Sequence, residues 1–210
     1  MKKTKVTEYY PNKRHDLSTV AIWKTLIQNI RESKDLIFQL FKRDFFAQYK
    51  KSFIGVTWAF ITPLFAIMSW VLMQATGVLN PGEVGVPYPI YILVGSSVWS
   101  LFIGLMNAAS STLTAAGGLL QQVKFHHEAI LFNKLLLKLT SFAISFSLVL
   151  AGISFFGVIP HWQTILLPIM ILPLLFYAIA AGLILAMVNV VAIDVSNFVN
   201  KFMNFLIYTV

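Results

Sequence analysis

The sequence of 210 residues contains no cysteine and little charge, and both shortages limit what the protein can be. Without cysteine it forms no disulfide and has no thiolate chemistry, although this leaves the cellular compartment open. Only 11% of the residues are charged and 58% are hydrophobic. Soluble domains have about 25% charged and about 45–50% apolar residues. The composition is therefore that of a membrane protein.

Two stretches of the chain are almost free of charge. Glu83 is the only charged residue between Ser52 and Lys124. No charged residue occurs between Lys138 and Asp194. Because a helix needs about 20 apolar residues to cross a membrane, we expect an all-α polytopic protein. The predicted spans are Phe53–Thr76, Pro89–Ala115, Leu135–Phe156 and Ile165–Ile193, with a fifth beginning near Phe202.

The segment before the spans carries most of the positive charge. Twelve of the sixteen Lys and Arg residues lie in residues 1–51, and no apolar core of a cleaved signal peptide follows the start closely. The net charge of +8 is therefore better explained by orientation in a membrane than by nucleic acid, which we do not expect as a partner. We divide the chain into an N-terminal segment, residues 1–52, and a transmembrane domain, residues 53–210.

Two helices are predicted within the N-terminal segment. Over Ser18–Ser33 the apolar residues with the spacing of one helical face are Trp23, Leu26, Ile27 and Ile30. Over Asp35–Lys51 an apolar row advances by fours through Ile37, Phe41, Phe45 and Tyr49. We expect this second helix to be amphipathic, with its aromatic row in the acyl boundary and its cations toward lipid phosphates. A solvated cytoplasmic helix is the alternative.

Positive charge alternates between the connections of the predicted spans. Residues 77–88 and 157–164 contain no Lys or Arg, whereas residues 116–134 contain two and residues 194–201 contain Lys201. Lys and Arg accumulate on the cytoplasmic side of membrane proteins. We therefore predict that the N-terminus and the two basic connections are cytoplasmic. The cations before the first span would anchor it at anionic headgroups.

The sequence shows little that indicates an enzyme. It has no GxxxxGK[ST] loop, so a partner must hydrolyse ATP if ATP drives the protein. His126, His127 and Glu128 are adjacent, but neighbours on a helix point about 100° apart and the HExxH spacing is absent. The spans contain no acidic and basic pair, which disfavours an ion-coupled carrier. We expect no catalytic residue, no metal site and no cofactor in this chain.

Several polar residues lie within the predicted spans, and they have two interpretations. They are Gln74, Asn107, Ser110, Ser111, Thr112, Thr114 and Asn189. Hydrogen bonding between helices is the favoured interpretation, because an unpaired polar group in hydrocarbon is costly. A functional role is the other. A substrate path lined by aromatic residues also stays open, because apolar sugar faces stack on rings.

The stretch DLIFQLFKRDFFAQYKKSFIGVTWAFITPLF has a specific resemblance. It resembles the start of the membrane subunits of type 2 ABC exporters that move cell-surface polysaccharides or polyol phosphates, such as O-antigen, capsule or teichoic acid. In that family an interfacial helix carries RD and YK pairs, and the first span opens with Gly and Trp and includes Pro. The matching residues are Arg43, Asp44, Tyr49, Lys50, Gly55, Trp58 and Pro63. The resemblance continues through ILVGSSVWSLFIGLMNAASSTLTAAGGLLQQVKFHHEAIL and covers the chain from about Asp35 to its end.

The chain departs from that family pattern at three points. His126 stands where the family has Pro after a hydrophobic, a basic and an aromatic residue. Ile193 precedes Asp194 where the family often has Arg, so a salt bridge is not carried over to this position. Family members have six spans, whereas this sequence stops at FLIYTV. We therefore expect a chain that is incomplete at its C-terminus.

The resemblance implies a homodimer in the bacterial inner membrane, with each subunit seated on a separate ATPase that holds ATP and Mg. A lipid-linked glycan would pass between the two membrane subunits when the ATPases close. We expect Leu119–Glu128 to receive this movement, with contacts at Gln122, Lys124, Phe125 and Glu128. Alternatively, Phe125 packs against its own interfacial helix.

The resemblance also implies a gate at the membrane surface, over Leu36–Ser52. Its residues facing the phosphate of the lipid linker would be Arg43, Asp44, Tyr49, Lys50 and Lys51. Anchoring of the first span explains the same cations equally well.

Two other functions remain open on the sequence. An exporter of the same type for a small lipid or a drug would keep the same topology. A membrane-embedded glycosyltransferase or acyltransferase would need acidic or His residues gathered near the interface. Glu83, His161 and Asp194 are too scattered along the chain to favour that enzyme.

Overall fold

A computed structural model of the chain describes residues 18–50, 52–78, 80, 82, 84–112, 127–159 and 162–207. Within these residues the chain forms helices and turns and no strand, so the predicted all-α class is confirmed. The helices are α1 (Thr19–Glu32), α2 (Lys34–Tyr49), α3 (Trp58–Ala75), α4 (Tyr88–Ser110), α6 (His127–Phe155), α7 (Leu167–Val191) and α8 (Ile193–Leu206). Two short 3₁₀ helices are η1 (Gly55–Thr57) and η2 (Trp162–Leu166).

Four helical segments of the described residues are long and apolar enough to cross a membrane. They are Gly55–Ala75, Tyr88–Ser110, Glu128–Phe155 and Ile169–Val191. Each overlaps one of the four complete spans predicted from the sequence. The chain is therefore a multi-pass membrane protein.

Two helices begin before the predicted spans, because charge lowers the hydropathy of a segment without ending a helix. α6 begins at His127, inside the connection predicted for residues 116–134, and has 29 residues. At 1.5 Å per residue it is about 43 Å long, so its first turns extend beyond a hydrocarbon core of about 30 Å. α8 begins at Ile193, so residues 194–201 are helical and the fifth helix starts well before Phe202.

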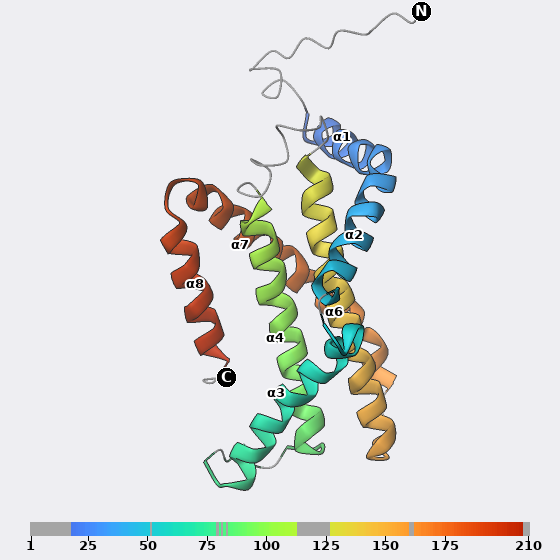
Figure 1. Cartoon of the computed structure of the whole chain (residues 1–210), viewed down its shortest axis with the longest axis vertical. Coiled ribbons are helices and arrows are strands. Elements are labelled where there is room, and N and C mark those ends of the chain that lie inside the picture. The colour runs from blue at the N-terminus through green and yellow to red at the C-terminus, as the bar shows by residue number, and fades with distance from the viewer. Residues whose placement is uncertain are drawn as a thin grey trace, which may run out of the picture.

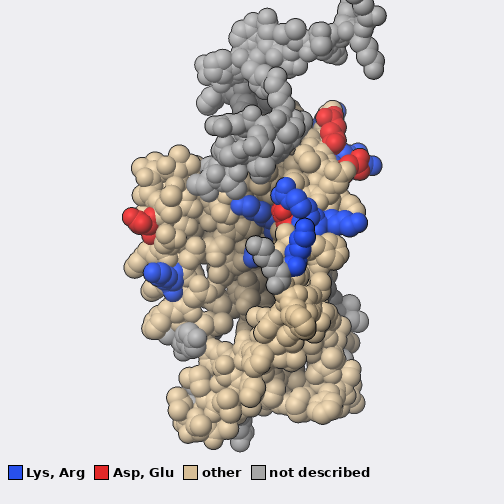
Figure 2. All heavy atoms as spheres, in the orientation of Figure 1, with Lys and Arg blue, Asp and Glu red and all other residues tan. Residues whose placement is uncertain are grey.

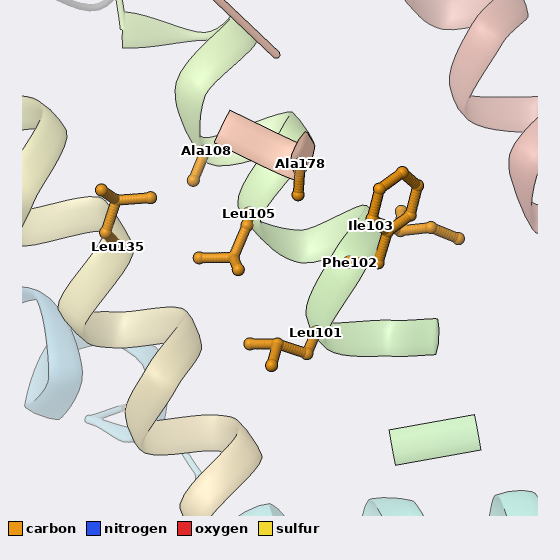
Figure 3. Packing of buried hydrophobic residues seen from close by; sticks show 7 residues of the cluster. All are labelled: Leu101, Phe102, Ile103, Leu105, Ala108, Leu135 and Ala178. Atoms are coloured by element: carbon orange, nitrogen blue, oxygen red, sulfur yellow. The ribbon is translucent and has the colours of Figure 1, made fainter. Parts of the chain in front are cut away.

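α4 is the central helix of the bundle and contacts α3, α6, α7 and α8 (Figure 1). Its buried cluster takes one residue from each of two neighbours and consists of Leu101, Phe102, Ile103, Leu105, Ala108, Leu135 and Ala178. Figure 3 shows Leu101 and Leu105 pointing from α4 toward α6. Because lipid tails are as apolar as these side chains, close packing rather than burial from water holds such a cluster together in a membrane.

Small residues let α7 approach α4 closely. Ala178 and Ala186 are fully buried, and Gly182 lies between them at intervals of four residues. A methyl group added at Gly182 would overlap the carbonyl oxygen of Met106 and would lie 2.6 Å from the Cβ atom of Ala109. The two helix backbones therefore meet at Gly182, as in other small-residue contacts between spanning helices.

One end of the bundle gathers the helix ends that the sequence predicts to be cytoplasmic. α1, α2, the end of α4, the start of α6 and the turn from α7 to α8 lie in the upper half of Figure 1. In Figure 2 the charged side chains lie over the upper half of the visible face, and the described surface of the lower half is uncharged. We call α1, α2, residues 107–112, residues 127–138 and Asn189 the polar end.

Candidate functional site at the polar end

α2 packs against the first turns of α6. Its apolar row is turned into the bundle, since Ile37 is 6% exposed and the three rings that follow it are half-buried. The ring centroids of Phe41 and Phe45 are 5.9 Å apart, and those of Phe45 and Tyr49 are 5.6 Å apart. The predicted row exists, but the most exposed ring of the helix is Phe38, which lies outside the row.

The turn between α2 and α3 depends on a glycine. Gly55 has a φ of 60°, a left-handed conformation that glycine adopts without the strain a side chain would cause. Its backbone N–H donates to Ser52 Oγ at 3.2 Å. The chain thereby changes direction between the two helices, so that α2 runs along α6 instead of extending α3 (Figure 1).

Asp44 joins α2 to α6. Its Oδ2 accepts a hydrogen bond from Asn133 Nδ2 at 2.7 Å, and its Oδ1 accepts one from Arg43 Nε at 2.8 Å. Asn133 is 3% exposed, and its Oδ1 has no hydrogen-bond partner among the described residues. A hydrogen bond to a charged group contributes about 1.5–3 kcal/mol to stability. Asp44 is therefore a fastening point for α2, whereas the Arg43 side chain stays 60% exposed.

The other predicted gate residues lie on the same helix or next to it. Lys50 is exposed, and Tyr49 is half-buried. Lys42 was not among the predicted gate residues, but it is exposed on the same helix. Lys51 lies outside the described residues. Together with Arg43, the two lysines give α2 an exposed set of three cations, which we call the basic strip. Such a set of N–H donors suits a phosphate or another anion.

Only one of the four predicted ATPase contacts is described. Glu128 lies in the first turn of α6, and its Oε1 accepts a hydrogen bond from Asn29 Nδ2 of α1 at 3.4 Å. A carboxylate in the first turn of a helix is also favoured by the helix dipole. Gln122, Lys124 and Phe125 lie outside the described residues, so their role stays a prediction.

The end of α4 is held by side chains from two other helices. The last carbonyl groups of a helix have no partner within that helix. Here Asn189 Nδ2 of α7 donates to the Ser110 carbonyl oxygen at 3.2 Å. Lys134 Nζ of α6 donates to the Ser111 carbonyl oxygen at 2.9 Å and to Ser111 Oγ at 2.8 Å. The predicted interhelical role of Asn189 is thus confirmed, and the lysine charge also suits the negative end of the helix dipole.

Sequence reasoning missed three residues of the polar end. Asn29, Asn133 and Lys134 belong to no motif, and the sequence marks Lys134 only as a charge in a connection. A usable signal was the run AILFNKLLLKL, in which a polar pair interrupts apolar residues. Polar groups at such a place need partners from neighbouring helices.

The polar end offers groups that bind and position neighbouring helices. Two of its four described carboxylates, Asp44 and Glu128, accept hydrogen bonds from neighbouring helices, and Glu32 accepts one from Gln28 of its own helix. Among the described residues no three His, Asp or Glu side chains lie close enough to hold a metal ion. The arrangement can hold five helices, α1, α2, α4, α6 and α7, in fixed positions and present cations at its surface.

Comparison with known proteins gives one curated relative that agrees with this arrangement. No protein-family model matches the chain. Over 138 residues the chain is 26% identical to the O-antigen export system permease protein RfbA of Myxococcus xanthus. The matched part is 65% of this chain and 52% of the relative, so the chain spans about half the length of that relative. A multi-pass membrane chain with a polar helical end is thus similar in sequence to a protein named as an export permease.

Proposed function

We propose that the chain is the membrane subunit of an ATP-driven exporter that moves a lipid-linked polysaccharide across the inner membrane. The observation that carries the proposal is the similarity to a permease named for O-antigen export. The four helices able to span a membrane support it, because a permease needs a membrane domain.

The ATP would be held and hydrolysed by a separate subunit. The sequence has no phosphate loop, so ATP and Mg are assigned to that partner. The contact is proposed for Leu119–Glu128, which joins the polar ends of α4 and α6. Asn189 and Lys134 hold the end of α4, and Asn29 holds Glu128 at the start of α6. A movement of this connection would therefore be transmitted to several helices. A second copy of the chain would complete the path of the glycan through the membrane.

The cargo would meet the chain at the basic strip. A lipid-linked glycan carries phosphate between its lipid and its sugars, and Lys42, Arg43 and Lys50 offer exposed N–H donors to that group. The strip lies on α2 at the polar end, which we assign to the cytoplasmic side together with the N-terminus. Lys51 follows the strip in sequence and is proposed as part of the same site.

The test begins with export itself. In the cells that encode the chain, its removal should abolish surface polysaccharide and leave lipid-linked glycan inside, as measured by surface labelling and by extraction of lipid-linked intermediates. Returning the wild-type chain should restore both. Unchanged surface polysaccharide after removal would overturn the proposal, and transferase activity of the purified chain without an ATPase would favour an enzyme.

A matched pair of charge variants tests the basic strip. Arg43→Gln with Lys50→Gln should reduce export at least tenfold, because the linker phosphate loses two of its donors. Lys24→Gln with Lys34→Gln removes the same charge from exposed positions outside the strip and should stay within twofold of wild type. Equal losses in both pairs would show that the cations act only as topological anchors.

The chain has no cysteine, so single introduced cysteines report its orientation. A cysteine at Gly85 should react with an impermeant maleimide in intact cells, and one at Gln122 should react only after permeabilisation. Labelling of Gln122→Cys in intact cells would overturn the cytoplasmic assignment of the polar end.

A further inference from the structure

Two adjacent residues of α6 bind two different helices. Asn133 donates to Asp44 on α2, and Lys134 donates to Ser111 at the end of α4. Neighbouring residues on a helix point about 100° apart, so these two residues can bind helices on two different sides of α6. We propose that Asn133 is a positioning residue of the transport cycle, which makes α2 follow the movements of α6.

The bond between Asn133 and Asp44 is specific enough for this role. It is 2.7 Å long, and one of its groups is a carboxylate, which makes it a short charge-assisted bond. Asn133 is buried and its Oδ1 has no partner among the described residues, so the bond to Asp44 is the hydrogen bond that orients its amide. Arg43 occupies the other oxygen of Asp44. Both carboxylate oxygens are therefore engaged while α2 lies against α6.

The first turns of α6 bind both N-terminal helices. Glu128 accepts a bond from Asn29 on α1, and Asn133 lies five residues further along α6 with its bond to α2. Lys134 ties the same part of α6 to the end of α4. Displacement of the start of α6 therefore moves α1, α2 and the end of α4 together. This step depends on the proposed function, since it assigns the ATPase contact to the connection between α4 and α6.

The consequence for transport is that the basic strip would change its position when the ATPases close. Arg43 is the neighbour of Asp44, so the attachment point and the strip are on the same helix. A fixed bond at Asp44 turns a movement of α6 into a movement of the cations that face the linker phosphate. Without that bond α2 would remain docked only by its apolar row.

An exchange of the two side chains separates positioning from simple loss of structure. Asn133→Asp places a carboxylate against Asp44, and like charges at this distance repel. We expect export to fall at least tenfold while the ATPase of the complex stays within twofold of wild type. Adding Asp44→Asn restores an amide and a carboxylate with reversed direction, and export should return to within about threefold of wild type. Failure of the double variant to improve on Asn133→Asp would overturn the proposal.

A distance measurement on the purified chain gives a readout that does not depend on cargo. Spin labels at Phe46→Cys on α2 and Leu139→Cys on α6 use exposed positions of a chain that has no cysteine. The wild-type background should give one narrow distance distribution, Asn133→Asp should broaden it, and the double variant should narrow it again. An unchanged distribution in Asn133→Asp would refute the fastening of α2. If wild-type cells show no glycan export but the distances behave as expected, the proposed function fails and the fastening stands.

Discussion

Hydroxyl groups donate to carbonyl groups of their own helix in both halves of the molecule, but the polar end also has side-chain hydrogen bonds between helices. At the polar end the hydrogen bonds of Asn29, Asn133, Lys134 and Asn189 reach other helices. In the apolar half, which comprises residues 58–75, 88–98 and 139–159, hydroxyl groups donate to carbonyl groups of their own helix. Examples are Ser69 to Phe65, Ser96 to Ile92, Ser147 to Ile144 and Ser154 to Leu150.

The difference teaches how each half fixes its helices. A hydroxyl that binds its own helix does not link that helix to a neighbouring one, so the helices of the apolar half are positioned by packing. That packing leaves an apolar groove of ≈ 530 Å³ lined by residues of α3, α4 and α6. At the polar end each interhelical bond requires a donor on one helix to lie within hydrogen-bond distance of a particular acceptor on another. Loss of any one of these interhelical bonds should therefore be costly, whereas substitutions of hydroxyl groups that bind their own helix should be mild.

The largest effect is expected where two backbones touch, at Gly182. Gly182→Ala should lower the free energy of unfolding by about 2–3 kcal/mol, because the added methyl group overlaps Met106 and Ala109. Gly152→Ala is the matched variant in the apolar half, where the added Cβ would lie 3.7 Å from Ile90 Cγ1. It should leave the free energy of unfolding unchanged or raise it by up to about 1 kcal/mol, because alanine has a higher helix propensity than glycine. SDS titration followed by circular dichroism measures both free energies of unfolding, and equal values would contradict a tight contact of the two backbones at Gly182.

The second effect concerns the end of α4. Lys134→Met should cost about 2 kcal/mol, because Ser111 loses a charged hydrogen-bond donor at two oxygens. Lys138→Met is the control on the same helix, since Lys138 is exposed and makes no hydrogen bond or ion pair with a described residue. If Lys138→Met lowered the free energy of unfolding as much as Lys134→Met, the hydrogen bonds to Ser111 would not explain the loss. The same SDS titration provides the measurement.

A smaller effect is expected from the second group at the end of α4. Asn189→Ala should cost about 1 kcal/mol, because a neutral donor to Ser110 is removed and its carbonyl is left buried. Asn204→Ala is the matched change at an exposed asparagine that donates to Asn200 of its own helix. It should change stability by less than about 0.5 kcal/mol. The reverse order of the two asparagines would contradict the role of interhelical bonds.

The smallest effect is expected in the apolar half. Ser147→Ala should change the free energy of unfolding by less than about 0.5 kcal/mol, because its hydroxyl binds the Ile144 carbonyl of the same helix. A loss above about 1 kcal/mol in thermal or SDS unfolding would show an interhelical role for this serine and would narrow the difference between the two halves.

Much of the fold followed from the sequence because hydropathy and charge determine which segments cross a membrane. The helix limits predicted at Ser18 and Ser33 agree with α1, and the first predicted span agrees with Gly55–Ala75. α6 begins eight residues before the predicted span, since Lys134 and Glu128 look like residues of a connection. Both are helical, and they bind Ser111 at the end of α4 and Asn29 of α1. Such contacts join residues far apart in sequence, and a single sequence does not reveal them.

The candidate site was predictable only in part for the same reason. The RD pair marked Arg43 and Asp44, but nothing in the sequence indicated that Asn133 is the partner of Asp44. The cations of α2 were visible as charge, while their exposure depends on which side of α2 packs on α6. Lys51 and three of the predicted ATPase contacts lie outside the described residues, so those assignments stay predictions.

The bond between Asp44 and Asn133 also sets an order of events during synthesis. The two residues are 89 positions apart, and α3 and α4 lie between them. At about 5–20 residues per second, a ribosome needs roughly 4–18 s to make that stretch. The first two spans therefore leave the ribosome before α2 can acquire its buried partner. Docking of the N-terminal helices is a late step of biogenesis, and it reports that the chain has been made at least as far as α6.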